Sequence, residues 1–307
     1  MLNMDKKIKI VFIHSGNALL PELHQYKNYF RFKYKVIIST DIKDAKLGDV
    51  VWFIMGSYRY KKLPHQVVIK EFPSLSLRPF AKFKNIVKSI LAMDSDIRIY
   101  LNDDVMSGYY EKSSNLVLLR DMGVANSFTN VRYEHCAYKE YDLIYVGDMS
   151  ASREIDSYLI DIIERNSNIR IALVGKKNKY IEDALSKYSD NIHFIGFVCQ
   201  DDLPFYLNKS KAALNIIPNI YPYNLQTSTK LQEYVAFGIP IITTDYYWAK
   251  RFLDKYSVPY LLLEEYLSGR EPIYYDVELN MCWEKIIESS KVEEKFLEML
   301  EGRRSVK

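Results

Sequence analysis

Long hydrophobic runs are absent from this sequence, whose longest apolar stretches have roughly seven residues, far fewer than the ~20 of a membrane-spanning helix. Cysteine is scarce: Cys136, Cys199 and Cys282 are far apart, odd in number and without metal-ligand spacing. This usage is more typical of a reducing compartment than of a secreted disulfide framework. No apolar leader opens the chain, because residues 1–9 run directly into a strand pattern. We therefore expect a cytoplasmic protein.

The rest of the composition is that of an ordinary globular chain. Apolar residues make up 48% of the 307 residues and charged residues 26%. This length suggests two domains of about 150 residues each. Apolar segments without polar alternation recur along both halves, and segments with helical character separate them. The pattern predicts α/β domains with parallel sheets covered by helices on both faces.

The expected strands fall into two series of six, at residues 6–15, 35–40, 49–56, 66–72, 97–103 and 115–121, and then at 141–149, 169–176, 191–198, 212–218, 240–245 and 258–263. A polar stretch at 129–141 separates the two series. We therefore predict two doubly wound, Rossmann-like domains, at 1–137 and 138–280. A single C-terminal helix is expected over 281–300, within the final segment 281–307.

Charge divides unevenly between the two halves. Residues 1–137 contain 21 basic and 13 acidic residues, a net charge of +8, and the rest carries −5. Aromatic side chains accompany the basic ones in Tyr58-Arg59-Tyr60-Lys61-Lys62 and again between Lys70 and Lys88. Such a surface can dock on an anionic membrane or meet a phosphate-bearing acceptor. An ordinary solvated face is the alternative. Nucleic acid is not an expected partner, because no RNA-binding motif accompanies these residues.

The segment from Thr227 to Pro240, TSTKLQEYVAFGIP, carries the strongest functional signal. It predicts a helix that begins at hydroxyl residues, among them Ser228 and Thr229, where free backbone N–H groups can bind an anion. Lys230 lies in the first turn, where the helix dipole disfavours a cation, so an anionic ligand would explain it. Glu233, one turn later, could accept hydrogen bonds from a ribose. A capped helix without a ligand is the alternative.

Residues 233–242, EYVAFGIPII, resemble the donor-binding helix of GT-B glycosyltransferases, in particular the GT4-like group. The resemblance implies two Rossmann-like domains with the active site in the cleft between them. It also implies a nucleotide-sugar donor bound by the second domain, and a last helix that crosses back to the first. The glutamate that the group usually carries eight residues before Glu233 is Leu225 here.

The resemblance implies further donor contacts. Arg153 would contact the diphosphate, and Gly175 would allow a tight turn beneath the base. Phe197 and Val198, within IGFV, match the element whose backbone amides meet the base. A surface arginine and plain strand-end turns are the alternatives.

In the first half, His14 and Gly16 follow the first strand, where Gly16 would let the backbone approach the donor phosphates and His14 would line the acceptor side. Glu71 and Asp103 lie at the ends of later strands. A catalytic base must lie within hydrogen-bond reach of the acceptor hydroxyl, and strand ends provide such positions. We expect Glu71 ahead of Asp103 in this role. A structural histidine is the alternative for His14.

Asp94-Ser95-Asp96 matches the D-x-D metal motif of GT-A glycosyltransferases. Here the motif precedes a strand instead of following one, which is typical of turn chemistry. We therefore expect no metal and no cofactor, with Lys230, Arg153 and the helix N-terminus acting on the phosphates instead.

Together these features predict a metal-independent GT-B glycosyltransferase that uses a nucleotide sugar, with UDP as the expected nucleotide. The expected acceptor is a surface polysaccharide or a lipid-linked glycan, and the expected place is the inner face of the membrane. Two alternatives stay open. One is a nucleotide-sugar 2-epimerase on the same fold, and the other is a non-catalytic GT-B subunit that binds a nucleotide sugar or a partner enzyme.

Overall fold

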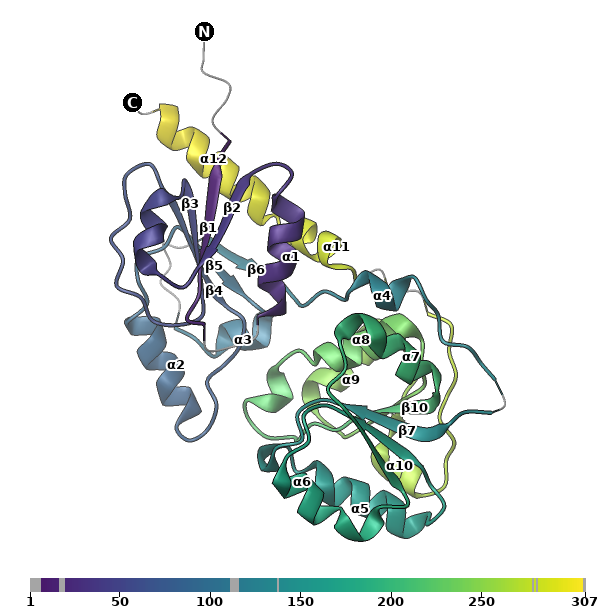
Figure 1. Ribbon diagram of the computed structural model, residues 1–307. Coiled ribbons are helices and arrows are strands. Elements are labelled where there is room, and N and C mark those ends of the chain that lie inside the picture. The colour runs from purple at the N-terminus through teal and green to yellow at the C-terminus, as the bar shows by residue number, and fades with distance from the viewer. Residues whose placement is uncertain are drawn as a thin grey trace. The chain divides into compact units, whose positions relative to one another are not determined.

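The computed structural model describes residues 7–16, 20–110, 116–136, 138–277, 279 and 281–305. Internal contacts divide the chain into two compact units: unit 1 comprises Met1–Met122 and Trp283–Lys307, and unit 2 comprises Gly123–Cys282. Each unit contains one six-stranded parallel sheet flanked by helices (Figure 1). The predicted fold class, α/β with two Rossmann-like domains, is confirmed. None of the helices in these described ranges is long and apolar enough to cross a membrane.

The sheet of unit 1 has the strand order β2-β1-β3-β4-β5-β6, and every neighbouring pair is parallel. Its strands are β1 (Lys9–Ile13), β2 (Lys35–Ser39), β3 (Val50–Ile54), β4 (Val67–Phe72), β5 (Ile97–Tyr100) and β6 (Leu116–Leu119). Its helices are α1 (Pro21–Phe30), η1 (Ile42–Leu47), α2 (Ala81–Ile90), α3 (Asp103–Ser107), α11 (Trp283–Ser289) and α12 (Val292–Ser305).

The C-terminal segment forms two helices, α11 and α12, where a single helix was expected over 281–300. The chain breaks between them at Lys291, whose φ is +56°, a left-handed conformation that a continuing helix cannot contain. In unit 1, α12 packs on α1: the Phe296 ring lies 6.0 Å from that of Phe30, and Glu293 accepts a hydrogen bond of 2.7 Å from Tyr34. The last helix therefore completes the core of the first sheet (Figure 1).

The sheet of unit 2 has the order β12-β11-β10-β7-β8-β9, again all parallel. Its strands are β7 (Tyr141–Val146), β8 (Ile171–Val174), β9 (Ile192–Gly196), β10 (Ser210–Asn215), β11 (Ile241–Thr243) and β12 (Leu261–Leu262). Its helices are α4 (Asn126–Thr129), η2 (Ala151–Arg153), α5 (Ile155–Arg165), α6 (Lys179–Ala184), η3 (Ser186–Tyr188), η4 (Gln200–Asp202), α7 (Leu203–Asn208), η5 (Tyr223–Leu225), α8 (Thr229–Phe237), α9 (Tyr247–Lys255) and α10 (Leu263–Leu267).

This strand order has a functional consequence. Counted within the unit, it reads 6-5-4-1-2-3, the order of dinucleotide-binding Rossmann folds, in which the winding reverses between the first and fourth strands. That switch point lies here between β7 and β10. Ligands of doubly wound sheets bind beyond the carboxyl ends of the strands at this point.

The division between the units falls at 122/123, where the sequence suggested 137/138. The reason is that the intervening segment belongs to the core of unit 2: Val124, Phe128 and Tyr133 are buried in its main hydrophobic cluster. The Tyr133 hydroxyl also donates a hydrogen bond of 3.0 Å to the carbonyl of Ser210 at the start of β10. The segment that follows Met122, including residues 129–141, therefore belongs to unit 2.

Candidate functional site

The switch point of unit 2 brings together the loop after β7, the end of β10 and the start of α8. Asn215, the last residue of β10, is buried and connects them. Its Nδ2 donates hydrogen bonds of 2.9 Å to Thr243 Oγ1 and to the Tyr246 hydroxyl, and its Oδ1 accepts one of 3.0 Å from Ser228 Oγ. These bonds fix the orientation of the amide, and the strand end and the helix start form one hydrogen-bonded unit.

Ser228 is in turn the N-cap of α8, because its Oγ accepts the N–H of Leu231 at 3.3 Å. Helix geometry leaves the amides of Thr229 and Lys230, both partly exposed, without an acceptor in the helix. At the other end the helix stops at Gly238, whose φ of +85° is left-handed and suits glycine. The partial positive charge of the N-terminus thus lies at the switch point, where it can bind an anion.

Lys230 and Glu233 form an ion pair within α8, with 2.6 Å between Nζ and Oε2. Gln200 donates a hydrogen bond of 2.7 Å to the other oxygen of Glu233. Sequence reasoning attributed Lys230 to an anionic ligand, and the structure adds a partner one turn along the same helix. One of the three ammonium N–H groups is used in this pair, so the others can still reach a ligand. The role of Glu233 as a ribose contact stays a prediction.

Arg153 closes the short helix η2 in the loop after β7. Its guanidinium lies 4.6 Å from the centre of the Tyr223 ring, and its Nε is 3.7 Å from Asp148 Oδ2. Burial raises the pKa of Tyr246, while its bonds to Asn215 and Ser228 and the charge of Arg153 act in the opposite direction. Arg153 is therefore within electrostatic range of the same network that holds the start of α8.

The ends of β7, β8 and β9 approach one another backbone to backbone. Gly175 donates its N–H to the carbonyl of Gly196 at 2.8 Å. A Cβ at Gly175 would lie 2.2 Å from the carbonyl oxygen of Gly147, so no side chain fits there. Beyond this edge the Phe197 ring is 78% exposed, whereas Val198 packs against the core. An exposed aromatic ring at a strand end can stack on a planar ligand.

In unit 1, Glu71 lies inside the core and is 1% exposed. It forms an ion pair with Arg120 and accepts hydrogen bonds from Trp52 Nε1 at 2.7 Å and from the Tyr26 hydroxyl at 3.2 Å. A base must reach the hydroxyl that it deprotonates. The predicted catalytic role of Glu71 is untested, but these contacts give it a structural role, and we do not carry it further.

The other two candidates in unit 1 lie at the carboxyl edge of the sheet. Asp103 is exposed. It is the first residue of α3 and directly follows the N-cap Asn102, whereas β5 already ends at Tyr100. His14 follows β1, and its Nδ1 accepts the N–H of Gly16 at 3.2 Å. Gly16 itself has a φ of +76°. Because the carboxyl ends of parallel strands meet at one edge of a sheet, Asp103 and His14 both lie at the edge where such sheets bind ligands.

A further carboxyl at this edge was not predicted. Glu22 lies in the first turn of α1 and is buried. Burial raises its pKa, and the charge of Arg120 opposes that shift. Glu22 is nearly as enclosed as Glu71, at 3% against 1% exposed, so it does not reach an acceptor hydroxyl either, and we do not carry it further as a base.

The D-x-D segment, residues 94–96, connects several parts of unit 1 through hydrogen bonds and ion pairs. Asp96 Oδ1 accepts hydrogen bonds from Lys62 at 2.9 Å and from Arg303 at 2.6 Å, and its Oδ2 accepts the N–H of Val68 at 2.8 Å. Asp94 lies 3.4 Å from the same lysine. The residues described in the structure include no group of three or more His, Cys, Asp or Glu side chains placed to hold a metal ion.

Residues 140–260 match the family model described as Glycosyl transferases group 1. No curated protein sequence matches this chain. Among the solved structures that share the fold are three that match nearly the whole chain. AviGT4, a glycosyltransferase involved in avilamycin A biosynthesis, is 12% identical with a TM-score of 0.61, and the match covers 96% of this chain and 98% of that one.

HepE of Anabaena, solved in complex with UDP and glucose, is 9% identical with a TM-score of 0.60, and the match covers 97% of this chain and 94% of that one. Sucrose-phosphate synthase from Thermosynechococcus elongatus is 11% identical with a TM-score of 0.64, over 98% and 99% of the two chains. The predicted resemblance to GT-B glycosyltransferases is confirmed by the family match in unit 2 and by the fold of the whole chain.

Proposed function

We propose that this chain, whose second unit carries a glycosyl transferases group 1 domain, transfers a sugar from a nucleoside-diphosphate donor to a glycan or lipid-linked acceptor. The observation that carries the proposal is the start of α8. Asn215 fixes its N-cap at the switch point of the sheet, and two cations, Lys230 and Arg153, lie in the same region. This combination is suited to a diphosphate.

In this proposal the amides of Thr229 and Lys230 bind the donor diphosphate. Breaking the bond between the sugar and the phosphate leaves negative charge on the departing nucleotide. Lys230, Arg153 and the N-terminus of α8 stabilise that charge, and the chain needs no metal or other cofactor for it. Glu233 accepts hydrogen bonds from the ribose, and Phe197 packs against the base. UDP is the proposed nucleotide, because HepE, which shares the fold, was solved with UDP and glucose.

The acceptor hydroxyl loses its proton as its oxygen attacks the sugar carbon. We assign this proton to a group at the carboxyl edge of the first sheet, with Asp103 first because it is an exposed carboxylate. His14 is the other candidate. Asp103→Asn and His14→Gln are made separately. The substitution at the residue that acts as the base should lower kcat without changing the affinity for UDP.

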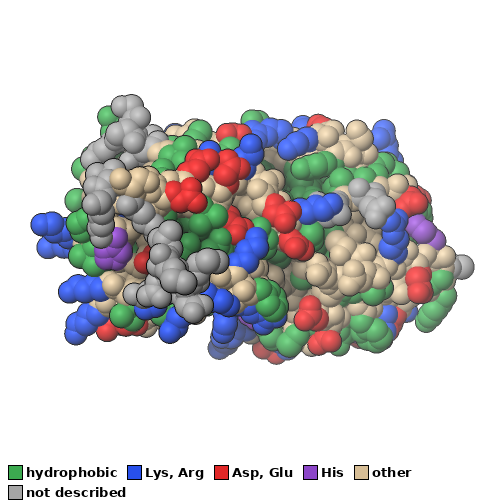
Figure 2. Space-filling model, turned by 90° about the horizontal axis from the view of Figure 1, so that it is seen from above, with side chains coloured by type: hydrophobic (Ala, Val, Ile, Leu, Met, Phe, Trp, Pro, Cys, Tyr) green, Lys and Arg blue, Asp and Glu red, His purple; other side chains and the backbone are tan. Residues whose placement is uncertain are grey.

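We also propose that α2 places the enzyme on an anionic membrane surface at the inner face, where lipid-linked acceptors lie. Phe83, Ile86 and Ile90 are exposed along one side of this helix, although they are apolar. Lysines flank them at Lys82, Lys84 and Lys88. A helix with exposed apolar side chains beside lysines is suited to lie in a membrane interface. By contrast, Figure 2 shows one face of the molecule on which acidic and basic side chains are interspersed.

Liposome co-sedimentation tests the membrane proposal. Vesicles with anionic lipids should bind the wild-type protein at low salt, and Phe83→Ser with Ile90→Ser should abolish the binding. Phe32→Ser is the matched control, because Phe32 is an exposed phenylalanine of the same unit outside α2. Equal binding by all three proteins would contradict the proposal.

A nucleotide panel tests the central proposal. UDP, GDP, ADP and CMP are compared by thermal unfolding, and then their sugar derivatives are compared for hydrolysis and transfer. A ligand at a hundred times its Kd should stabilise the fold by about 2.7 kcal/mol. Stabilisation by UDP with slow hydrolysis of a UDP-sugar would support the proposal. Binding without turnover of any sugar would favour a non-catalytic subunit, and an epimeric sugar product would favour the epimerase alternative.

A further inference from the structure

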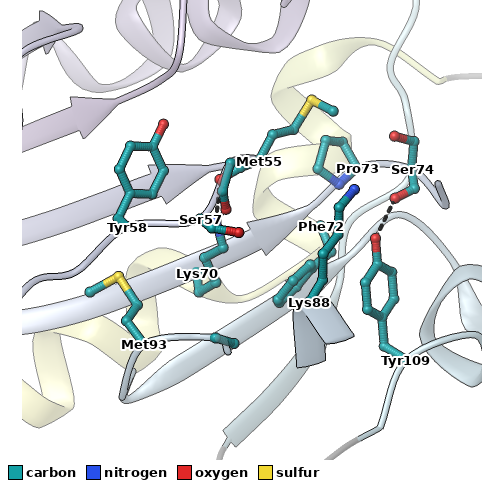
Figure 3. Close-up of a pocket in the computed structure, with 12 residues that line it drawn as sticks. Met55, Ser57, Tyr58, Lys70, Phe72, Pro73, Ser74, Lys88, Met93 and Tyr109 are labelled. Carbon is teal, nitrogen blue, oxygen red and sulfur yellow. Dashed lines mark hydrogen bonds between the residues drawn. The ribbon is translucent and has the colours of Figure 1, made fainter. Parts of the chain in front are cut away.

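A pocket lies in unit 1, just beyond the ends of β3 and β4 (Figure 3). The chain from Met55 to Tyr58 forms one part of its wall, and Phe72 to Ser74 forms another. Lys70 from β4 and Lys88 from α2 are both among the residues that line it, with Tyr109 and Met93 nearby (Figure 3). Its lining belongs entirely to unit 1 and shares no residue with the site at α8.

Lys70 is buried, although it carries an amine. Its Nζ donates hydrogen bonds to the carbonyls of Met55 and, at 2.8 Å, of Gly56, and it lies 5.1 Å from the centre of the Tyr58 ring. A Cβ at Gly56 would lie a tight 3.0 Å from that ring, and the φ of +61° is left-handed, so glycine suits this position. An ammonium has three N–H groups, and the third is left for another acceptor.

Neither lysine has a carboxylate partner among the described residues. Glu71 follows Lys70 in β4, so it faces the other side of the sheet, where Arg120 pairs with it. Lys88 is exposed and forms no ion pair or hydrogen bond within the described chain. Tyr58, which also lines the pocket, has a buried hydroxyl without a described hydrogen-bond partner. The pocket therefore has donors and positive charge in excess of acceptors.

The excess of positive charge affects the pKa values of both lysines. Burial lowers the pKa of Lys70 to about 7, the charge of Glu71 opposes the shift, and the charges of Lys88 and Arg98 add to it. Arg98 is the neighbour of Lys70 across β4 and β5. Burial and the charge of Lys84 also lower the pKa of Lys88. Without a counter-charge, the buried amine avoids the cost of an isolated ion by releasing its proton.

We propose that this pocket binds a phosphoryl group and that the binding places a proton on Lys70. A phosphate monoester carries about two negative charges, which match two lysines, and lysine is a common phosphate ligand. The cavity volume is about 20 Å³, enough for one small polar group and too small for a sugar ring. The pocket would therefore hold the phosphorylated end of a larger molecule. If the proposed glycosyl transfer is correct, that molecule is the acceptor, and only this last step rests on the proposed function.

Sulfate is the probe for the test, because it stays fully ionised between pH 6 and 8, whereas phosphate titrates there. Isothermal calorimetry with the full-length protein should show one saturable sulfate site. Lys70→Met should weaken sulfate binding at least tenfold, and Lys88→Met should weaken it less. Lys84→Met is the matched control, because Lys84 lies one turn earlier on α2 and outside the pocket lining. The affinity of this variant for sulfate should equal that of the wild type.

The proton linkage predicts a pH dependence. Sulfate should bind the wild type about tenfold more weakly at pH 8 than at pH 6, because the free amine with a pKa of about 7 is mostly neutral at the higher pH. In addition, sulfate should raise the pKa of the Lys70 amine, as followed by NMR of reductively methylated lysines. Affinity that is independent of pH would overturn the linkage. This readout also tests Lys70 without any mutation.

Three further results would overturn the site itself: no saturable sulfate binding in the wild type, equal binding in Lys70→Met, or an equal loss in Lys84→Met. Competition distinguishes the sources of the phosphoryl group. A water-soluble lipid phosphate and a sugar phosphate are each tested for displacement of sulfate, and displacement by either supports the proposal. Displacement by neither would overturn the phosphoryl assignment. Because no donor or turnover is involved, these outcomes are independent of the test for glycosyl transfer.

Discussion

The two units have the same architecture, a six-stranded parallel sheet with helices, yet they hold their buried polar groups differently. In unit 2 the strand ends are held by a neutral network in which Asn215 joins Thr243, Tyr246 and Ser228. In unit 1 the same region of the sheet contains ionic groups: the pair of Glu71 and Arg120 on one side and Lys70 on the other.

This difference affects how each unit responds to a change in pH or to the loss of a charged partner. Amide and hydroxyl groups do not titrate near neutral pH, so we expect the hydrogen bonds at the start of α8 to persist over a wide pH range. Buried ions depend on their partners, and losing a partner leaves an uncompensated charge. The family match also falls in unit 2, over residues 140–260. The contrast is therefore between a neutral hydrogen-bond network at the start of α8 in unit 2 and buried ionisable groups in unit 1.

The largest expected effect comes from the ionic core of unit 1. Arg120→Met leaves Glu71 charged and buried, and should lower the free energy of unfolding by about 3–5 kcal/mol in urea denaturation. Glu71→Leu together with Arg120→Met should recover most of the loss, because both charges are then absent. Lys33→Ala is the control, since it removes a partly exposed pair with Glu293 and a contact with the Tyr29 ring, and should cost about 0–1 kcal/mol. An equally small effect of Arg120→Met would remove the contrast between the units.

The next effect concerns catalysis in unit 2. Lys230→Ala should lower kcat/KM for sugar transfer by about a hundredfold, since a group that stabilises developing charge is lost. Lys250→Ala is the matched control, because Lys250 pairs with Asp245 elsewhere in the same unit. If Lys230→Ala keeps wild-type turnover and nucleotide affinity, the lysine serves only its ion pair with Glu233.

A pH effect follows from Lys70. Its pKa of about 7 is below that of an unfolded lysine, so between pH 7 and 10.5 the unfolded state binds the proton and the folded state does not. Stability from this group therefore rises with pH across that window, by about 2 kcal/mol from pH 7.5 to 9. Lys70→Met should lack this rise when both proteins are unfolded in urea without phosphate or sulfate. Parallel pH profiles for the two proteins would show that Lys70 keeps an ordinary pKa.

The smallest effect tests the ribose contact. Glu233→Gln keeps the shape of the side chain and loses the charged acceptor, so UDP affinity should fall about tenfold. A 2′,3′-dideoxy nucleotide should bind wild type and mutant alike, because it lacks the hydroxyls in question. Since Glu233 also pairs with Lys230, Glu233→Gln is compared with Lys230→Met by calorimetry. Equal discrimination against the dideoxy nucleotide in wild type and mutant would place the ribose elsewhere.

Much of the fold was predictable from the sequence because parallel strands covered on both faces are continuous apolar runs. Each of the twelve observed strands overlaps a predicted segment, and α8 begins and ends at the residues whose chemistry suggests it. The helix α9 was missed, and the predicted C-terminal helix is broken at Lys291. The residues at the break, Ser289-Ser290-Lys291, include no glycine or proline that would have indicated it.

The candidate site was predictable only in part. Ser228, Thr229 and Lys230 were found because a helix N-terminus has a local sequence signature. Asn215 was missed, because its partners Thr243 and Tyr246 come from a strand and a helix far along the chain. A polar residue that ends an apolar strand, as in AALN, is the signal that could have indicated it.

By itself, the sequence determined the alternation of strands and helices, the number of sheets and the position of the helix that begins with Ser228, because hydrophobic periodicity and capping are local properties. Only the tertiary structure decided which charged residues are buried and with which partners. Glu71 had the sequence position of a catalytic base, and the fold paired it with Arg120. Lys70 had the position of a surface charge, and the fold enclosed it. Burial and pairing depend on residues brought together from distant parts of the chain, and no local pattern contains that information.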